Sequence, residues 1–365
     1  MKILHIEAGR HLYGGAKQVL HLLEGLAQRG HENVLVCPGH AEYVQQARRF
    51  SRVISMPMGG DLDIRLYARL VRTVRETQPD LMHAHSRRGA DFYPGLCARR
   101  LDIPAVLSRR VDNREPVWLA RLRARLFDRV VVISEAIGSV QRSLGVPADK
   151  LVCIRDAIDA EPFMQSMPKR VWREQHGLPE SAMVVGMVAQ FIPRKGHRVL
   201  LESLEHLLPR HPELHVALYG RGPLEADVQA DVRARGWEQR VHFMGFVDDL
   251  AQQLGALDLM VHPAAAEGLG VSLLQGAAAG LPIVGTDAGG IPEAVQAGVT
   301  GLIVPSGRAD ALGQALHTLL ENAQMRSEMG AAGRARVVQN FSVETMVQAH
   351  IALYRTLMES RHVSG

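Results

Sequence analysis

One stretch of this sequence combines a carboxylate, a glycine turn and the start of a helix. Glu267 stands directly before Gly268 and Gly270, after an apolar run at 257–262 that is typical of a buried strand. Glycine lets the backbone amides of a tight turn approach an anion closely. Residues 271–279 are helix formers, and the N-terminus of a helix attracts phosphate through unpaired N–H groups and the helix dipole. The spacing therefore predicts a phosphate-binding turn flanked by the Glu267 carboxylate.

A lysine and further glycine turns follow other apolar segments. Lys195 follows the segment 183–189, and a lysine beside a phosphate acts as a point charge that stabilises a developing anion. Glycine turns also follow the segments at 2–8 and 215–219. The alternatives are an exposed loop lysine and plain turns between elements. Because ligands of open α/β sheets bind at the carboxyl ends of the strands, we expect these turns to line the ligand site.

Two histidines end the apolar segment 81–84. We take His83 and His85 to point to opposite faces of this strand, so that only one of them serves a ligand. The alternative for an isolated pair is a buried histidine with satisfied hydrogen bonds, or one that faces solvent. No third ligand is evident nearby, which argues against a zinc site.

Positive charge is concentrated in one N-terminal region. Residues 86–129 hold eleven arginines and five acids, whereas the whole chain has 42 Lys and Arg against 38 Asp and Glu, a net charge of +4. That overall surplus is too mild to indicate nucleic acid. Arginine pairs at predicted strand ends suit a phosphorylated or carboxylated acceptor, because a guanidinium group binds such groups bidentately. These pairs are Arg87 with Arg88 and Arg109 with Arg110.

A basic helix follows at 118–129. Trp118, Leu122 and Leu126 share one face of it, and arginines occupy another. Such a helix can lie on an anionic bilayer. The alternative, which we favour for the fold, is a helix that packs its apolar face on the domain and leaves a basic back in solvent. The two interpretations are compatible in one helix.

The whole chain is predicted to form two α/β domains. Its 365 residues exceed what one hydrophobic core usually organises. Apolar strand segments alternate with helical segments in both halves, which predicts doubly wound parallel sheets. The three cysteines are far apart and form no disulfide framework or metal-binding pattern, and no apolar run is long enough to span a bilayer. We therefore expect a cytoplasmic protein.

These motifs together resemble the retaining glycosyltransferase family 4, whose members have the GT-B fold. In that family a glutamate opens the glycine turn and a second glutamate follows eight positions later. Here these positions hold Glu267 and Gln275. The glycine loop after the first strand, the Lys-Gly pair and the histidine at position 85 also match, and the resemblance covers essentially the whole chain. Lys17 and Gln190 stand where the family usually has Glu and Arg.

The resemblance implies a site in which His85, Glu267 and Lys195 are catalytic. The residues that it assigns to the donor are Gly15, Gln190, Arg194, Lys195, Gly220, Arg221, Phe246, Val247, Glu267, Gly268, Leu269, Gly270, Val271 and Gln275. Gly14 and Gly15 would meet the acceptor, together with the four arginines of the two pairs. The resemblance also implies a UDP- or GDP-sugar as co-substrate, no further cofactor and no metal ion.

The implied fold is an α/β GT-B fold of two Rossmann-like, doubly wound domains that face a central cleft. We expect an N-terminal acceptor domain at 1–162, a C-terminal nucleotide-sugar domain at 163–342, and a helix at 343–365 that packs back on the N-terminal domain. The implied reaction is retaining transfer of a sugar to a hydroxyl of an envelope glycan or glycolipid, such as lipopolysaccharide core. Together with the basic helix at 118–129, a cytoplasmic location would allow peripheral contact with the inner face of the cytoplasmic membrane.

Two alternatives stay open on the sequence. The residues at positions 17, 190 and 275 would also suit a non-catalytic protein that binds a sugar nucleotide. Other GT-B chemistries are a phosphorylase, for which no cofactor lysine is evident, and a sugar-nucleotide epimerase, whose signature differs from the one at Glu267. Hydrolysis of the donor without an acceptor would separate an enzyme from a binding protein.

Overall fold

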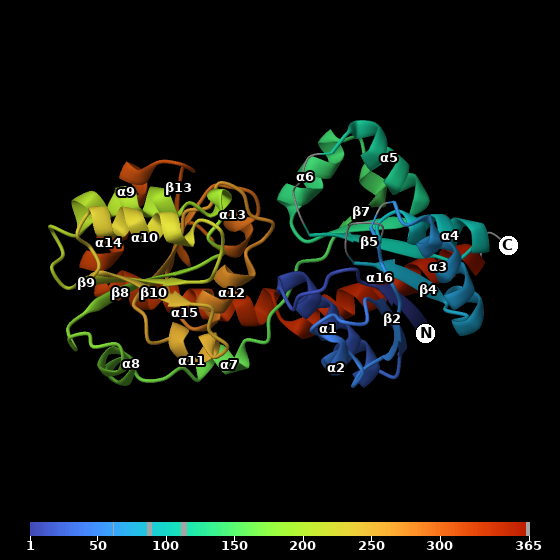
Figure 1. The fold of residues 1–365 in the computed structure, drawn as a ribbon, viewed down its shortest axis with the longest axis horizontal. Helices are drawn as coiled ribbons and strands as arrows, with labels where there is room; N and C mark the ends of the chain where they lie inside the picture. The colour runs from blue at the N-terminus through green and yellow to red at the C-terminus, as the bar shows by residue number, and fades with distance from the viewer. Residues whose placement is uncertain (61, 86–89, 111–114, 363–365) are drawn as a thin grey trace. The chain divides into compact units, whose positions relative to one another are not determined.

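The computed structural model describes residues 1–60, 62–85, 90–110 and 115–362 of the chain. The chain divides into two compact units, residues 1–157 together with the chain from Val343 onward, and residues 158–342. Figure 1 labels the helices and strands of both. Each unit is built on one parallel sheet with helices, which confirms the α/β class predicted from the alternating segments.

The first unit has a seven-stranded parallel sheet with the order β3-β2-β1-β4-β5-β6-β7. Its strands are β1 (Lys2–Ile6), β2 (Glu32–Cys37), β3 (Arg52–Ser55), β4 (Leu81–Ala84), β5 (Ala105–Arg109), β6 (Arg129–Val132) and β7 (Leu151–Cys153). Its helices up to the linker are α1 (Gly14–Gln28), α2 (Val44–Ala47), α3 (Ile64–Thr77), α4 (Tyr93–Leu101), α5 (Val117–Leu126), α6 (Glu135–Ser143) and the 3₁₀ turn η1 (Ala148–Lys150). The central strands β1, β4 and β5 are buried along nearly their whole length, as parallel strands covered on both faces are.

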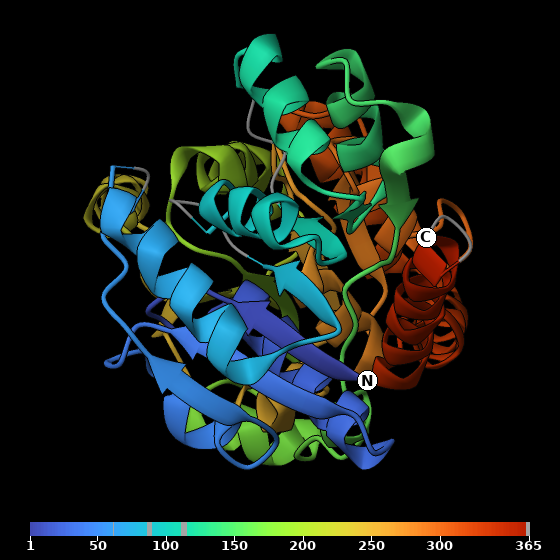
Figure 2. The same ribbon diagram turned by 90° about the vertical axis from the view of Figure 1, so that its right-hand side faces the viewer.

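The last helix, α16 (Val343–His362), belongs to the first unit although it follows the whole second unit in sequence. Figure 2 shows it in red, with the strands of the first sheet in blue to green. It packs against α1, where a Cβ on Gly25 would lie 2.5 Å from a methyl carbon of Val347, so glycine permits the close approach. Ile351 and Tyr354 of α16 join Ile3 of β1 in a buried core cluster.

The second unit has a six-stranded parallel sheet with the order β10-β9-β8-β11-β12-β13. Its strands are β8 (Met183–Val188), β9 (Leu214–Tyr219), β10 (Val241–Gly245), β11 (Leu259–His262), β12 (Ile283–Thr286) and β13 (Gly301–Val304). Its helices are α7 (Glu161–Met164), α8 (Lys169–Gln175), η2 (Pro193–Lys195), α9 (His197–Leu207), α10 (Glu225–Ala234), α11 (Leu250–Leu254), α12 (Val271–Ala278), α13 (Ile291–Ala294), α14 (Ala309–Glu321) and α15 (Ala323–Asn340).

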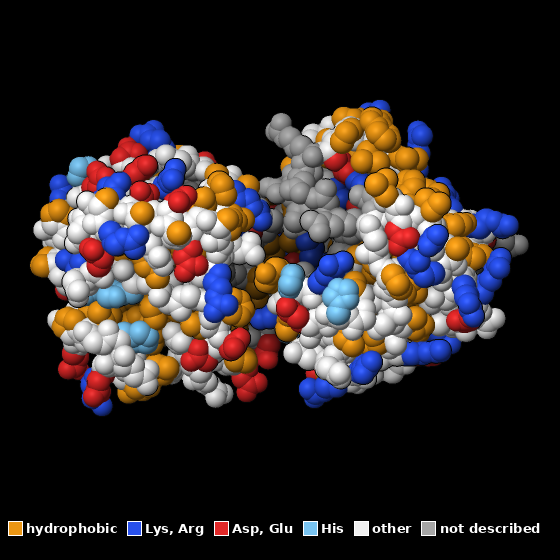
Figure 3. Space-filling model, viewed as in Figure 1, with side chains coloured by type: hydrophobic (Ala, Val, Ile, Leu, Met, Phe, Trp, Pro, Cys, Tyr) orange, Lys and Arg blue, Asp and Glu red, His pale blue; other side chains and the backbone are white. Residues whose placement is uncertain are grey.

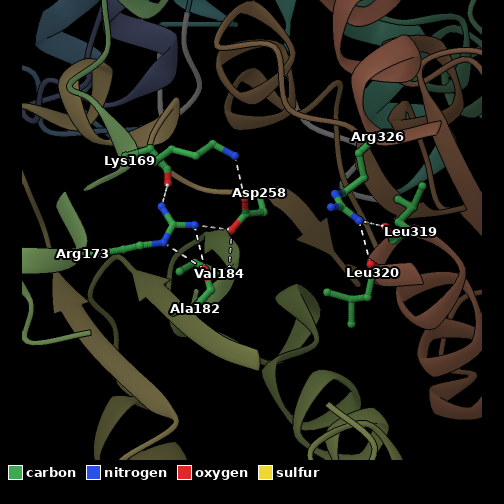
Figure 4. Close-up of polar contacts among 9 residues, drawn as sticks. Lys169, Arg173, Ala182, Val184, Asp258, Leu319, Leu320 and Arg326 are labelled. Carbon is green, nitrogen blue, oxygen red and sulfur yellow. Dashed lines mark hydrogen bonds and ion pairs between the residues drawn. The ribbon is translucent and has the colours of Figure 1, made fainter. Parts of the chain in front are cut away.

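Two arginines tie helices of the second unit to its sheet and to each other (Figure 4). Arg173 of α8 donates a 2.7 Å hydrogen bond to Asp258, which also accepts the backbone N–H of Val184 at 2.8 Å. The Asp258 carboxylate, directly before β11, therefore joins α8 to β8. Arg326 of α15 donates to the carbonyl oxygens of Leu319 and Leu320, which lie in the last turn of α14 and lack partners within that helix.

Helix α5 does not pack the apolar face of Trp118 and Leu122 on the domain, which is the arrangement that we favoured. Trp118 is 67% exposed and Leu122 is 36% exposed, whereas Arg123 and Ala124 are buried. Arg123 can be buried because its guanidinium donates to the Glu115 carboxylate, which compensates its charge. Hydrophobic side chains gather over this region in Figure 3. Among the described helices, none is both long and apolar enough to cross a membrane.

Candidate functional site

Glu267 lies in the turn between β11 and α12, at the centre of a compact polar cluster in the second unit. Its Oε2 accepts hydrogen bonds from the ammonium group of Lys195 and from Nε2 of His262, the latter at 2.9 Å. Its Oε1 accepts the backbone N–H of Gly268 at 3.1 Å. The Lys195 and Glu267 side chains are only 11% and 12% exposed, so the ion pair is largely shielded from water. Glu267 is thereby held in one orientation at the start of α12.

The surroundings of Glu267 and His262 determine the protonation states of both side chains. Burial acts to raise the pKa of Glu267, but the hydrogen bond from His262 and the charge of Lys195 outweigh it and lower the pKa to about 2. Burial lowers the pKa of His262, and its bond to Glu267 offsets this only in part. Near neutral pH the cluster therefore contains a carboxylate and a neutral imidazole. That imidazole must carry its proton on Nε2, because a carboxylate oxygen can only accept.

The glycines at 289 and 290 explain why the predicted turn is so closely packed. A Cβ on Gly289, whose φ is 54°, would lie 2.1 Å from the carbonyl oxygen of Glu267. A Cβ on Gly290 would lie 2.1 Å from the carbonyl oxygen of Gly268, and its N–H donates to the Glu267 carbonyl at 3.0 Å. The second glycine turn thus supports the backbone of the first, which only residues without a side chain permit.

Lys195 reaches Glu267 because two loops of the second unit pack directly on each other. Gly196 has a φ of 78°, and a Cβ there would lie 2.0 Å from the carbonyl oxygen of Pro263. The backbone N–H of Ala265 donates to the carbonyl of Arg194 at 2.8 Å. The Arg194 side chain is exposed, with Nη1 3.5 Å from the carbonyl of Ala266. The 3₁₀ turn therefore presents a buried lysine and an exposed arginine side by side.

The other predicted donor residues of this unit follow the same edge of the sheet. Gln190 is exposed after β8, and Gly220 follows β9, with a Cβ position 2.0 Å from the carbonyl of Ala189. Arg221 places its guanidinium 5.9 Å from the ring centre of Phe246, which follows β10 and is 56% exposed. Val247, which also follows β10, is half-buried. The predicted donor residues of the glycine turn and of α12 are buried or half-buried as well, namely Gly268, Leu269, Gly270, Val271 and Gln275. The carboxyl ends of β8 to β11 thus gather this set.

In the first unit the histidines do not point apart as we expected. The ring centres of His83 and His85 lie 3.8 Å apart. The expectation was wrong because side chains alternate along a strand with a period of two, so residues i and i+2 share a face. His83 is bonded through both ring nitrogens, to the Tyr354 hydroxyl at 2.6 Å and the Ser108 hydroxyl at 2.8 Å. Both ring nitrogens of His83 are therefore engaged within the protein.

A third histidine, His5 of β1, lies beside the other two, which corrects the expectation that no further metal ligand is near. Nitrogens of His5, His83 and His85 lie within 4.8 Å of one another. His5 nevertheless uses both of its nitrogens in hydrogen bonds, to His85 at 2.9 Å and to Asn33 at 3.3 Å. A metal ion could bind here only if several of these buried hydrogen bonds were broken.

Arg110 lies next to His85 at the carboxyl ends of β4 and β5. Its Nη1 donates to the backbone carbonyl of His85 at 3.1 Å, and its Nε donates to Asp156 at 3.2 Å. Burial raises the pKa of the Asp156 carboxyl, although Arg110 acts against this. A Cβ on Gly15 would lie 3.7 Å from the Arg110 side chain, and Gly14 is exposed at the start of α1. The predicted glycine loop, one arginine and His85 therefore converge.

Residues 13–162 match the family described as glycosyltransferase family 4, and residues 168–336 match the family described as glycosyl transferases group 1. The first match begins after β1 and includes His85 and Arg110, and the second includes all six strands of the second unit together with Lys195 and Glu267.

The chain belongs to the family 4, group 1 glycosyltransferases.

Several relatives of this chain are named as sugar transferases. This glycosyltransferase is 28% identical to the lipopolysaccharide core biosynthesis mannosyltransferase LpsB of Rhizobium meliloti, over 75% of this chain and 79% of that protein. It is 27% identical to the GDP-mannose-dependent alpha-(1-6)-phosphatidylinositol monomannoside mannosyltransferase of Mycolicibacterium smegmatis, over 91% and 92% of the two chains.

Solved structures show the fold. HepE of Anabaena in complex with UDP has a TM-score of 0.86 at 23% identity, with 98% of this chain and 100% of that chain covered. A glycosyltransferase of Rickettsia africae has a TM-score of 0.87 at 17% identity, with 98% of both chains covered. These likenesses confirm the predicted GT-B fold.

Of the two described arginines that we expected at the acceptor, Arg110 lies beside other site residues of the first unit and Arg109 does not. Arg87 and Arg88 lie outside the described residues. Arg109 is 2% exposed, donates a 2.7 Å hydrogen bond to Glu115 and lies 3.5 Å from Asp91. This burial corrects the expectation of an open, ligand-facing side chain, because internal carboxylates already engage its guanidinium.

Three polar residues at the glycosyltransferase site were missed by the sequence analysis. His262 ends an apolar run, and His5 and Asn33 lie inside predicted buried strands. A single polar residue in an apolar strand was the available signal, because a buried polar group needs a hydrogen-bond partner. The sequence did not indicate which partners these would be, since they come from neighbouring strands and distant loops.

Proposed function

We propose that this glycosyltransferase moves a sugar from a UDP- or GDP-sugar to a hydroxyl group of a cell-envelope glycan or glycolipid, with retention of configuration and without a metal ion. The observation that carries this proposal is the shielded ion pair of Lys195 with Glu267 at the glycine turn before α12. LpsB is named for lipopolysaccharide core, the mycolicibacterial relative for a phosphatidylinositol mannoside and GDP-mannose, and HepE was solved with UDP. These names support the donor and acceptor classes.

The cluster has the groups that departure of a nucleoside diphosphate needs. The Lys195 ammonium and the backbone N–H groups at the glycine turn supply positive charge and dipoles for the leaving phosphate. Glu267 uses Oε1 for one described bond, that from Gly268, so a lone pair remains for a sugar hydroxyl. His85 and Arg110 are the corresponding polar groups of the first unit. These residues would bind and orient the sugar and acceptor while the diphosphate departs.

The proposed step breaks the bond between the anomeric carbon and the diphosphate oxygen and forms a bond from that carbon to the acceptor oxygen. The proton of the acceptor hydroxyl moves to an oxygen of the departing phosphate. When the acceptor attacks on the face from which the diphosphate leaves, the anomeric configuration is retained. Lys195 supplies charge that a metal ion provides in other phosphate sites.

The proposal is tested with sugar nucleotides. UDP-glucose and GDP-mannose are compared by thermal shift, where a ligand at a hundred times its dissociation constant adds about 2.7 kcal/mol of stability. The stabilising donor is then incubated with and without EDTA, and its hydrolysis and transfer are followed by NMR of the anomeric proton. We expect turnover that EDTA does not abolish. Binding without any hydrolysis or transfer would instead favour the non-catalytic alternative.

Replacing Gln275 by glutamate should strengthen donor binding. A carboxylate at this half-buried position on α12 would accept hydrogen bonds as an ion, and such bonds contribute roughly 1.5–3 kcal/mol against about 1 kcal/mol for neutral ones. We expect the donor dissociation constant of Gln275→Glu to fall by up to about tenfold, with kcat nearly unchanged. Calorimetry and steady-state kinetics measure the two quantities. A variant that binds the donor more weakly would contradict the ribose-binding role of position 275.

We further propose that α5 docks on an anionic membrane, which would place the enzyme at the inner face of the cytoplasmic membrane. Val117, Trp118 and Leu122 are exposed on this helix, and so are Arg121 and Arg125. Tryptophan and leucine can insert at the interface, while each arginine near an anionic surface contributes about 1 kcal/mol. The combination of apolar and basic side chains fits acidic phospholipids better than a neutral partner.

The double variant Trp118→Ser, Leu122→Ser should lose membrane binding. We expect its partition onto vesicles of phosphatidylglycerol and phosphatidylcholine to fall roughly tenfold, because two exposed apolar side chains no longer leave water. Cosedimentation measures this, and high salt should weaken the wild type as well. Val338→Ser on α15, which replaces a side chain that is 49% exposed, is the matched control. Equal partition of all three proteins would exclude α5 as the docking face.

A further inference from the structure

A chain of buried hydrogen bonds runs through three strands of the first unit and ends at His85. Asn33 lies on β2, His5 on the neighbouring strand β1, and His85 directly after β4 on the other side of β1. All three side chains are at most 3% exposed. The His5 Nε2 is 3.3 Å from Asn33 Oδ1, and the His5 Nδ1 is 2.9 Å from His85 Nε2. Each link can be assigned a donor and an acceptor.

The assignment begins at the Asn33 amide. Its Nδ2 donates to the backbone carbonyls of Leu23 at 2.8 Å and Phe50 at 3.1 Å. Carbonyl oxygens can only accept, so the nitrogen of the amide must face them. The atom that faces His5 is therefore the amide oxygen, which also can only accept. His5 must donate its proton from Nε2 to Asn33.

The same logic passes along the chain to His85. Burial lowers the pKa of His5 to about 3, so its ring is neutral near pH 7 and its Nδ1 carries a lone pair. His85 Nε2 faces that lone pair and must be the donor of the 2.9 Å bond. Burial also lowers the pKa of His85 well below its usual value. A neutral His85 with a protonated Nε2 has its own lone pair on Nδ1, and no described residue donates a hydrogen bond to that atom.

We propose that Asn33 and His5 are positioning residues that hold His85 in the Nε2–H tautomer, so that its Nδ1 accepts a hydrogen bond from a hydroxyl group of the sugar or acceptor. A lone pair at this position attracts an O–H or N–H group and repels the oxygen atoms of phosphate and carboxylate. The proposal rests on the proposed function, in which His85 contacts the reacting sugar. It deepens that function by defining the ligand group as a hydrogen-bond donor.

Two further contacts support a fixed orientation for His85. Its backbone carbonyl accepts the 3.1 Å bond from Arg110, and its ring lies against those of His5, at 5.2 Å between centres, and His83, at 3.8 Å. The ring can therefore neither flip nor rotate freely among these neighbours. An unpaired buried acceptor is costly in the absence of ligand, and a ligand hydroxyl would satisfy it.

The first experiment measures the tautomers directly in the ligand-free protein. The chain is labelled with ¹⁵N-histidine, and long-range ¹H–¹⁵N spectra at pH 7 distinguish protonated from unprotonated ring nitrogens, with His85→Gln and His5→Gln used for assignment. We expect both His5 and His85 to carry their proton on Nε2. A proton on Nδ1 of His85, or a charged ring, would overturn the proposal without reference to any substrate.

The second experiment connects the tautomer to the reaction. His5→Phe removes the acceptor for His85, and we expect a loss of kcat/KM of about tenfold for whichever of UDP-glucose or GDP-mannose is turned over. His5→Gln offers an N–H for Asn33 and an oxygen for His85, so it should restore most of that loss and keep the tautomer. Tyr354→Phe removes a hydroxyl from the same histidine cluster outside the chain of bonds, and it should change neither the His85 tautomer nor kcat/KM by a comparable factor.

The outcomes separate this inference from the proposed function. The expected tautomers in a protein that turns over neither donor would leave the hydrogen-bond chain intact and contradict the proposed reaction. An active enzyme in which His5→Phe and His5→Gln behave alike would contradict the positioning role. Donor analogues in which one hydroxyl is replaced by fluorine test the ligand group. The analogue at the contacted position should bind about tenfold more weakly to the wild type, and this penalty should disappear in His85→Leu.

Discussion

Replacement of Lys195 by alanine should lower kcat by about 10²- to 10³-fold, the effect of removing about 3–4 kcal/mol of preorganised electrostatic stabilisation from a transition state. The Lys195 side chain is only 11% exposed and directly contacts Glu267, so its charge acts where water screens it poorly. The leaving diphosphate gains its charge as the sugar departs, and the variant would have no ammonium group at that position. Steady-state rates of donor consumption with saturating acceptor measure the effect.

Arg198→Ala is the matched control for this prediction. Arg198 is exposed on α9, three residues beyond Lys195, and lies 3.8 Å from Asp231 rather than near Glu267. Its removal subtracts the same charge from the same region, and we expect kcat to change by less than about threefold, because an exposed ion pair contributes little. If both variants lose activity equally, the general positive charge of the unit, and not the position of Lys195, would be responsible.

Replacement of Glu115 by glutamine should destabilise the first unit by about 3 kcal/mol, at the lower end of the range for breaking a buried ion pair. The Glu115 side chain is 6% exposed and bonds to both Arg109 and Arg123, which also lie near Asp91 at 3.5 and 3.4 Å. The change keeps the shape of the side chain and removes the negative charge of Glu115, one of the two described carboxylates beside these buried guanidinium groups. Urea denaturation followed by circular dichroism measures the loss.

Glu76→Gln serves as the comparison for Glu115→Gln. Glu76 pairs with Arg72 one helical turn away on α3, where the two side chains are 55% and 82% exposed. Exposed pairs of this kind contribute little to stability, so we expect a much smaller change than for Glu115→Gln. Equal stability changes in the two variants would show that the buried network around Arg109 is neutral for folding, and Arg109 would again be a candidate for ligand contact.

The turn at Glu267 could be predicted because its chemistry is local. The glycines, the carboxylate and the helix formers are contiguous in sequence, and Gly289 and Gly290 follow within one βα unit. The alternation of apolar strands with helical segments likewise predicts parallel sheets without any long-range information. Backbone requirements such as the positive φ of Gly196 and Gly270 are also properties of single positions.

The errors arose where a side chain's surroundings depend on distant segments. Trp118 and Leu122 have the spacing of a packed apolar face, yet Arg123 is on the buried side because Glu115 and Asp91 compensate its charge. Helical periodicity indicates that a helix is amphipathic and does not indicate which face the core will receive when buried ion pairs compete with apolar contacts.

The hydrogen-bond partners of several polar residues at the site also come from segments that are distant in sequence. Contiguous residues with local backbone preferences were sufficient to predict the two sheets and the glycine turns, whereas the phosphate-binding role of Lys195 and Glu267 stays a prediction. The hydrogen-bonded chain from Asn33 through His5 to His85, and the contact of His262 with Glu267, required the folded sheet, since strand order and register determine which buried polar atoms meet. A buried donor or acceptor must find a partner, and only the tertiary structure supplies it.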